Sequence, residues 1–425
     1  MSIDHDDLKP GADLRGRVLG GAHIPGIDLS GANMDGSKLV MAFLPEAKLS
    51  EASFFEADIS GAEMGAANLQ GANLSSATAE KTNFSGANLA NADLKEISAR
   101  QAKFFESQLT KSNLSGAVLA QTCFEDACLQ EANLSHANLT GVNFVDANLD
   151  GANLAGANLS TAVFFGASLI GANFTAATLS SAVLSGANLR GTNFFNAYLP
   201  QAVLSDANLD LGNLEGANLS RALRYKTSLN GANLEGADLS QALLEEAFLQ
   251  EANLEKAYMR QASLNGDVLS GANFKEATLV LADLTGAKLD GATFEQAECS
   301  LALFDEADLS QVNFKDANLG RTQMAKTNLS GVCLAGAMLA EACLFEANLQ
   351  GADLQSATLI RTDFTCADLQ GADLRGAVIQ GASFLEANLC SANLEGADLW
   401  AANIVKGSTR WNEETRWPDG YTPPN

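Results

Sequence analysis

The sequence has no long apolar run, few histidines and no paired cysteines. Although 47% of its 425 residues are hydrophobic, no apolar stretch approaches the ~20 residues that a membrane-spanning helix needs. The three histidines (His5, His23 and His136) are isolated, and the seven cysteines form no Cys-x-x-Cys pair. These absences argue against a membrane span, a metal centre and a disulfide framework, and they favour reduced thiols in a cytoplasmic protein.

The residue groups that catalysis requires are also missing. Acidic residues are frequent, but they recur at regular spacing, and no base, nucleophile and oxyanion-stabilising group converge in the sequence. The glycines keep a fixed phase instead of forming a phosphate-binding loop. We therefore expect a protein that is not an enzyme and that has no cofactor.

What the sequence does contain is a five-residue repeat that keeps its phase from about Leu14 to Ile404. Positions whose numbers end in 4 or 9 hold Leu, Phe, Ile or Met almost throughout, usually with Ala two residues earlier and Asn or Asp one residue earlier. Gly often follows two residues later. The recurring turn residues predict a bend every five residues, with the small and the large apolar side chains facing inward. Such a chain winds into a solenoid.

The phenylalanines indicate how many units complete one coil. Fourteen of them occupy the large apolar position, and all of these carry numbers ending in 4. The runs 84-104-124-144-164 and 274-294-314 favour a spacing of twenty residues, which is four repeats. We therefore predict a square coil in which Phe stacks on Phe in successive coils on two opposite faces.

These units resemble the pentapeptide-repeat family, whose repeats follow the pattern A(D/N)LxG, as in residues 151–160 (GANLAGANLS). The resemblance covers most of the chain. It implies an all-β fold, a right-handed quadrilateral β-helix (a β-solenoid), here with about 20 coils of four pentapeptides. We expect an N-terminal cap over residues 1–11, the repeat domain over 12–405 and a C-terminal cap over 406–425, since the tail holds Trp411 and Trp417 and lacks the repeat.

Two residues break the inward pattern. Arg224 occupies a large apolar position, where an unpaired charge is costly to bury. We expect a local bulge in which Leu223 fills the core and Arg224 reaches solvent; an internal ligand or ion-pair site is the alternative. Asp267 replaces the small inward residue, and we expect its carboxylate to accept hydrogen bonds from nearby backbone amides.

Charge is the main feature of the outward positions. The net charge is −25, and folding the sequence at twenty residues per coil gathers acids into a stripe along one face: Glu46, Glu106, Asp126, Asp146, Asp206, Glu246, Glu306, Glu346 and Glu386. A second acidic set holds Glu215, Glu235, Glu255, Glu295 and Glu395, and a third set is basic (Lys81, Arg100, Arg221, Arg260, Arg321 and Arg361). The stretch between Asp150 and Asp206 has no acid, and it carries Phe165, Phe195 and Tyr198 at outward positions.

Two functions fit these features. The first is a non-catalytic scaffold that binds one or more proteins through the outward residues Glu106, Asp126, Asp146, Asp206, Glu246, Glu306, Phe165, Phe195 and Tyr198. In this hypothesis the neutral stretch is a contact site, either for a partner protein or for self-association. The second is a mimic of double-stranded DNA that binds DNA gyrase, as the resemblance to the quinolone-resistance and mycobacterial members implies. Direct binding of nucleic acid is disfavoured by like charge.

Overall fold

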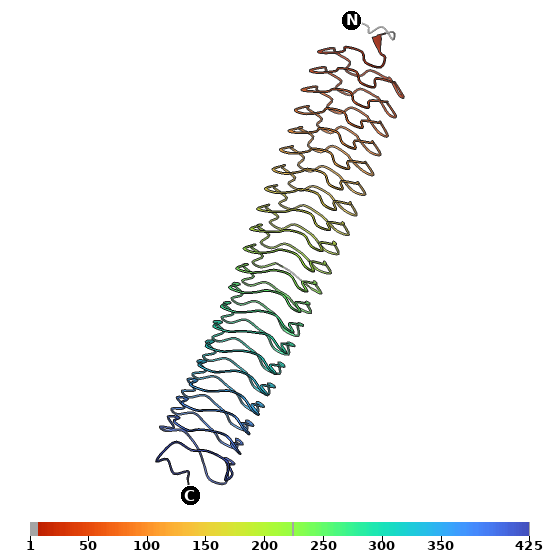
Figure 1. The fold of residues 1–425 in the computed structure, drawn as a ribbon. Helices are drawn as coiled ribbons and strands as arrows, with labels where there is room; N and C mark the ends of the chain where they lie inside the picture. The colour runs from red at the N-terminus through yellow and green to blue at the C-terminus, as the bar shows by residue number, and fades with distance from the viewer. Residues whose placement is uncertain (1–6, 223–224, 425) are drawn as a thin grey trace. The chain divides into compact units, whose positions relative to one another are not determined.

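The protein is built from stacked coils that are linked by parallel backbone pairing. The computed structural model describes residues 7–222 and 225–424, so the predictions for Leu223 and Arg224 lie outside the described residues. The chain forms two compact units, unit 1 (Met1–Asn213) and unit 2 (Leu214–Asn425). In Figure 1 each unit is a stack of coils, with unit 1 running from red to yellow-green and unit 2 from green to blue.

Regular structure consists of isolated β-bridges joined by turns, and no α-helix occurs in residues 7–222 or 225–424. In that described part of the chain, no helix has the length and apolar character that a membrane crossing requires. Asn and Gly recur too often for long strands to form. Each repeat therefore contributes a single bridged residue, flanked by a turn on either side.

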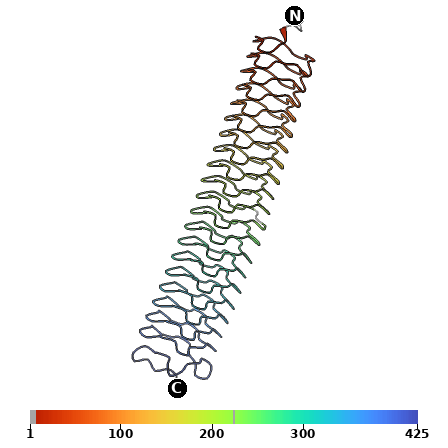
Figure 2. The same ribbon diagram turned by 45° about the vertical axis from the view of Figure 1, so that its right-hand side comes forward.

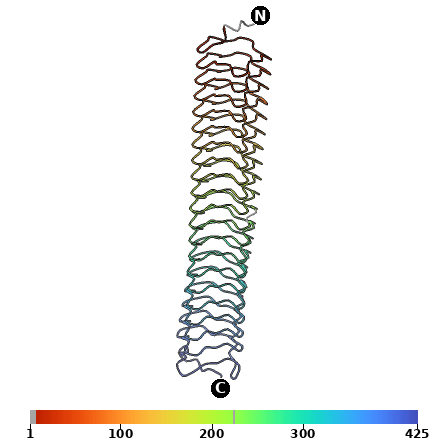
Figure 3. The same ribbon diagram turned by 90° about the vertical axis from the view of Figure 1, so that its right-hand side faces the viewer.

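The bridges confirm the twenty-residue coil. Asn153 pairs with Asn173 and Val163 pairs with Val183, and throughout the described repeats the bridges are parallel and join residues twenty apart. Each fully described coil has four bridged residues and hence four sides. Figures 2 and 3 show the successive coils stacked within each unit. We number the sides I to IV by their bridged residues, which lie 3, 8, 13 and 18 above a multiple of twenty.

A tight turn joins each side to the next. In the turn after Leu159, the amide of Ala162 donates to the carbonyl of Leu159 at 3.0 Å, and Thr161 between them has φ 58°. A left-handed third residue is what a type II turn requires. The two turn residues between neighbouring sides form a corner, and each corner is named after the two sides that it joins. Counted above a multiple of twenty, corner I/II holds residues 5 and 6, corner II/III residues 10 and 11, corner III/IV residues 15 and 16, and corner IV/I residues 0 and 1.

The core of each unit follows the inward pattern of the sequence. The Ala and Leu or Phe positions are almost all buried, and many are inaccessible to solvent. Phe104 and Phe124 stack with ring centroids 4.7 Å apart on side I of unit 1, and Phe174 stacks on Phe194 at 4.9 Å on the opposite side III. In unit 2, Phe294 stacks on Phe314 at 4.8 Å. The predicted phenylalanine stacks on two opposite sides are therefore confirmed.

Backbone pairing continues beyond the last sequence repeat. Asn388 bridges Arg410 and Asn393 bridges Arg416, so the spacing grows from twenty residues to 22 and 23. Trp411 packs edge-on against Trp417, with ring centroids 5.9 Å apart, and Trp417 stacks on Tyr421 at 5.4 Å. The tail therefore pairs with the last coil of unit 2 through two bridges, besides its own bridge between Lys406 and Thr409, although its side chains no longer follow the repeat.

Candidate protein-interaction surfaces

The described inward positions of both units hold apolar side chains and a few polar ones. Inward polar residues are mostly hydroxyls that bond backbone carbonyls, as when Thr362 Oγ1 donates to the Leu339 carbonyl at 2.8 Å. Within residues 7–222 and 225–424, no three His, Cys, Asp or Glu side chains are grouped so that they could hold a metal ion. All seven cysteines are free thiols, and burial raises the pKa of the Cys299 thiol above its usual range.

Asp267 is the exception inside unit 2. It lies at an inward position between corner I/II and side II, and its side chain is inaccessible to solvent. Its Oδ1 atom accepts the Ala247 amide at 2.9 Å, as the sequence predicted, while Oδ2 has no hydrogen-bond partner. Burial, reinforced by the nearby charge of Glu245, raises the pKa of Asp267 to about 8, against the lowering effect of the Ala247 hydrogen bond.

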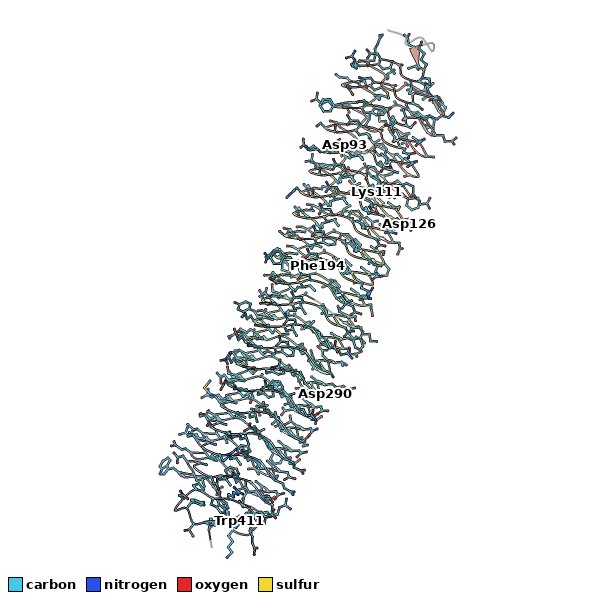
Figure 4. All side chains as sticks on the ribbon, viewed as in Figure 1. Asp93, Lys111, Asp126, Phe194, Asp290 and Trp411 are labelled. Atoms are coloured by element: carbon cyan, nitrogen blue, oxygen red, sulfur yellow. The ribbon has the colours of Figure 1, made fainter. Side chains whose placement is uncertain are left out.

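The predicted acidic stripe lies on a corner and is not continuous. Glu106, Asp126 and Asp146 lie on three consecutive coils at corner I/II of unit 1, where all three are exposed and have φ between 54 and 57°. Asp206 shares this corner but lies three coils further on. We call the three consecutive acids the 106–146 column; Asp126 and, at another corner of the same unit, Lys111 are labelled in Figure 4. In unit 2, Glu246 and Glu306 occupy corner I/II three coils apart.

Gly166 makes room for the last acid of this column. Its φ is +69°, and a Cβ atom added to it would overlap the Oδ1 atom of Asp146. The carboxylate of Asp146 therefore lies against bare backbone, one coil along the same corner. Any side chain at residue 166 would displace that carboxylate and would also be strained by the left-handed backbone.

The second acidic set is more mixed than the sequence alone suggested. Its members Glu215, Glu235, Glu255, Glu295 and Glu395 lie at corner III/IV of unit 2, which also carries Lys256, Lys275 and Lys315. Lys256 Nζ lies 3.1 Å from Glu255 Oε1 and 3.9 Å from Glu235 Oε1. Local pairing therefore offsets part of the negative charge at this corner.

The three apolar residues predicted from the neutral stretch form two separate patches. Phe165 is 55% exposed at corner I/II, whereas Phe195 is 36% exposed at corner III/IV on the opposite edge of the coil. Tyr198, 49% exposed, lies on side IV three residues after Phe195. The structure thus brings Phe195 and Tyr198 together on one coil and separates them from Phe165.

Beside Phe165 lies an apolar column that the sequence analysis missed. Val163, Val183 and Val203 are the bridged residues of side I on three successive coils, and each is half-buried. The signal was available, because all three numbers lie 3 above a multiple of twenty. It was overlooked since bridged positions elsewhere are mostly Asn or Asp, which suggested a uniformly polar position.

Charges of alternating sign follow one corner of unit 2. Corner IV/I carries Arg321, Glu341 and Arg361 on consecutive coils. Glu341 Oε2 lies 2.9 Å from Arg321 Nε, and its Oε1 lies 3.8 Å from Arg361 Nη1. A shallow hollow of about 350 Å³ lies along this corner and side IV; it is lined by Ser300, Leu301, Asn318, Gly320, Arg321, Ala340 and Glu341.

The family model of pentapeptide repeats (8 copies) matches this chain over most of its length, and the chain belongs to that family. The matched segments span residues 12–223, 227–266, 268–298, 302–339 and 342–404. The family fold is the right-handed quadrilateral β-helix, in agreement with the four-sided coils of both units. Members of the family are generally structural or otherwise non-catalytic proteins.

Solved structures of similar sequence come from the same family. The chain is 32% identical to HetL, a pentapeptide-repeat protein involved in heterocyst differentiation regulation from the cyanobacterium Nostoc sp. strain PCC 7120; the match covers 53% of this chain and 91% of HetL, with a TM-score of 0.27. It is 20% identical to QnrB1, a plasmid-mediated fluoroquinolone resistance protein, over 48% of this chain and 90% of that one, with a TM-score of 0.20. No curated protein matches the chain significantly.

Proposed function

We propose that this protein is a non-catalytic interaction scaffold whose outward side chains bind partner proteins. The observation that carries the proposal is that the inward residues and the backbone of each repeat hold the fold together, whereas the outward side chains do not. Inward residues are buried apolar side chains and the backbone groups of successive coils bond each other. The outward residues are therefore free to vary without cost to the core, and they present side chains at a fixed rise of ~4.8 Å per coil.

The partner-binding residues that we propose are the 106–146 column, Asp206, Glu246, Glu306, Phe165, and the pair Phe195 and Tyr198. Most of them are turn or bridge residues with no role in the core. We further propose about 20 coils in all, with residues 1–11 and 406–425 covering the two ends, and a cytoplasmic location in keeping with the free thiols. Self-association through the neutral stretch belongs to the same proposal.

Selective loss of a partner tests the scaffold function. The chain with Glu106, Asp126 and Asp146 replaced by Lys should lose a protein partner that the wild-type chain retains after purification from its own cells. A matched control replaces Glu56, Glu96 and Glu131 by Lys, because these acids also have left-handed φ values of 54 to 57° but lie at other corners. Equal retention of partners by both variants would refute the assignment of the 106–146 column.

A DNA mimic that acts on DNA gyrase or a related topoisomerase is the second candidate function. It is favoured by the 106–146 column, where a carboxylate recurs on each of three coils as phosphates recur along a strand. It is disfavoured by the arginines of corner IV/I and by the absence of acids between Asp150 and Asp206, where Arg190 is the one charged residue. A supercoiling assay separates the candidates, because a mimic should inhibit gyrase or protect it from a quinolone, and the triple Lys variant should lose that effect. An unchanged supercoiling rate at micromolar wild-type protein would exclude the mimic.

A further inference from the structure

Two columns of opposite charge pattern occupy neighbouring corners of unit 2. The 321–361 column consists of Arg321, Glu341 and Arg361 at corner IV/I, so its signs run plus, minus, plus on three consecutive coils. The 306–346 column consists of Glu306, Lys326 and Glu346 at corner I/II, and its signs run minus, plus, minus. All six side chains are exposed. The two columns flank side I from its opposite edges.

The 306–346 column is not neutralised within the described part of unit 2. None of its three charged side chains has an ion-pair partner within 4.0 Å among the described residues, which include its column neighbours one coil away. In the 321–361 column, Glu341 forms ion pairs with both arginines, and the distance from its Oε1 atom to Arg361 Nη1 is long at 3.8 Å. Arg361 is 75% exposed along its side chain. Each column therefore keeps one unit of excess charge, positive for the first and negative for the second.

We propose that these columns dock two copies of this chain side by side, with the 321–361 column of one copy against the 306–346 column of the other. Both columns belong to one solenoid and therefore have the same rise per coil, so three opposite-charge pairs form together: Arg321 with Glu306, Glu341 with Lys326, and Arg361 with Glu346. The sign patterns read the same in both directions, so charge alone also permits antiparallel copies; the parallel orientation is part of the proposal because it also aligns the apolar side chains described below. This inference rests on the proposed function, because it assigns recognition to outward residues.

The charges also fix the register of the contact. A slide of one coil would set Arg321 against Lys326 and Glu341 against Glu346, so that two attractive pairs become repulsive ones. Like charges placed opposite each other are destabilising, and such mismatches are how specific interfaces reject wrong alignments. Within the parallel orientation a second copy is therefore held in one register, which a single acidic or basic column would not achieve.

Apolar side chains fall into the same alignment. The residue that precedes Arg361 is Ile360, and the residue that precedes Glu346 is Phe345; both are half-buried. Two coils further along, Trp400 (72% exposed) is in register with Leu385 (39% exposed). Both pairs have the fifteen-residue offset that joins Arg361 to Glu346. Exposed aromatic anchors beside paired charges are typical of protein interfaces.

In the proposed side-by-side contact the pairing is made once, between corner IV/I of one copy and corner I/II of the other, and such a contact is heterologous. Each copy in a pair keeps one column unoccupied, and association by this contact alone continues beyond the dimer into rows of parallel molecules. High salt should dissolve the rows because exposed ion pairs are screened.

Mixing two complementary charge variants tests the inference with purified full-length protein. Arg361→Glu destroys the 321–361 column and Glu346→Arg destroys the 306–346 column, and each should weaken self-association at low salt by about tenfold or more, because attraction becomes repulsion. An equimolar mixture of the two should associate again, since the altered corner of each is complementary to the altered corner of the other. Lys315→Glu at corner III/IV is the control with the same change in net charge as Arg361→Glu.

Sedimentation velocity at low and high salt supplies the readout, with circular dichroism to check that each variant is folded. Association of the wild type and of Lys315→Glu, loss in each single variant and recovery in the mixture would support the contact. A monomeric wild type at low salt, single variants that associate normally, or a mixture that stays monomeric would each overturn it. A monomeric wild type would also contradict self-association through the neutral stretch, but partner binding by the scaffold is tested separately, by partner retention in the 106–146 variants of unit 1.

Discussion

Removal of the buried carboxyl group of Asp267 should stabilise the protein, and by an amount that depends on pH. The folded state raises the pKa of Asp267 from 3.8 to about 8, whereas the unfolded chain has an ordinary aspartate pKa of about 4. Folding therefore binds a proton between these values. The contribution of Asp267 to stability is least unfavourable below pH ~4, worsens as the pH rises to ~8, and is constant above that.

The size of the effect follows from the shift in pKa. One unit corresponds to about 1.4 kcal/mol, so a shift of about four units amounts to on the order of 5 kcal/mol above pH 8. The physical cause is the low polarity around Oδ2, which has no hydrogen-bond partner, so that an ionised carboxylate would be poorly solvated there. At the same place in another coil the hydroxyl of Thr327 donates to the Met324 carbonyl at 2.7 Å, whereas the Oδ2 atom of Asp267 has no such partner.

Two variants isolate this contribution. Asp267→Ala restores the usual small inward residue, and Asp267→Asn keeps the shape and the Oδ1 acceptor but cannot ionise. Urea denaturation from pH 4.5 to 9 should give a stability difference between Asp267→Asn and the wild type that grows with pH and levels off near pH 8. The other acids titrate equally in both proteins and cancel in the difference. A difference that stays constant over the whole range would refute the raised pKa.

Three further outcomes follow from the packing. Gly166→Ala should lower the free energy of unfolding by about 1–3 kcal/mol in urea denaturation, because it adds left-handed strain and displaces the carboxylate of Asp146. The control Gly171→Ala, with φ +66° and no atom within 4 Å of the added Cβ, should lose only the part due to strain. Equal losses of stability in the two variants would contradict the role of Asp146. Phe124→Ala should cost about 3–5 kcal/mol, since the ring is inaccessible to solvent and stacked on both faces, and an unchanged melting temperature would contradict this. Cys299, buried and with a raised thiol pKa, should resist a thiol reagent in the native protein while the partly exposed cysteines react, as mass spectrometry of labelled peptides would reveal.

The sequence alone was sufficient to predict the coil. Turn residues recur without insertion, and each coil repeats the contacts of the one before, so a single periodicity fixes register, sides and core together. The phenylalanine stack from Phe84 to Phe164 was predictable for that reason. The backbone pairing of Arg410 and Arg416 was not predictable, because the tail forms these bridges without the side-chain pattern that marks them in the repeats.

The outward residues were harder to place. Counting by twenty grouped Glu106, Asp126 and Asp146 correctly, but it did not reveal that they lie on a corner. The linear sequence, by contrast, joined Phe165 to Phe195 in one neutral stretch, although they lie on opposite corners of the coil. Nearness in the sequence is a poor guide here, since residues half a coil apart face away from each other while residues a full coil apart are in contact.

The five-residue repeat thus determined which side chains of this protein are inside, because inward and outward positions alternate with the turns in a fixed phase. Only the tertiary structure decided what the outward side chains meet. The side chains of the 106–146, 306–346 and 321–361 columns form continuous surfaces because backbone hydrogen bonds between successive coils place residues twenty apart next to each other. The protonation of Asp267 was likewise decided by the fold, since burial in the coil, and not its neighbours in the sequence, raises its pKa.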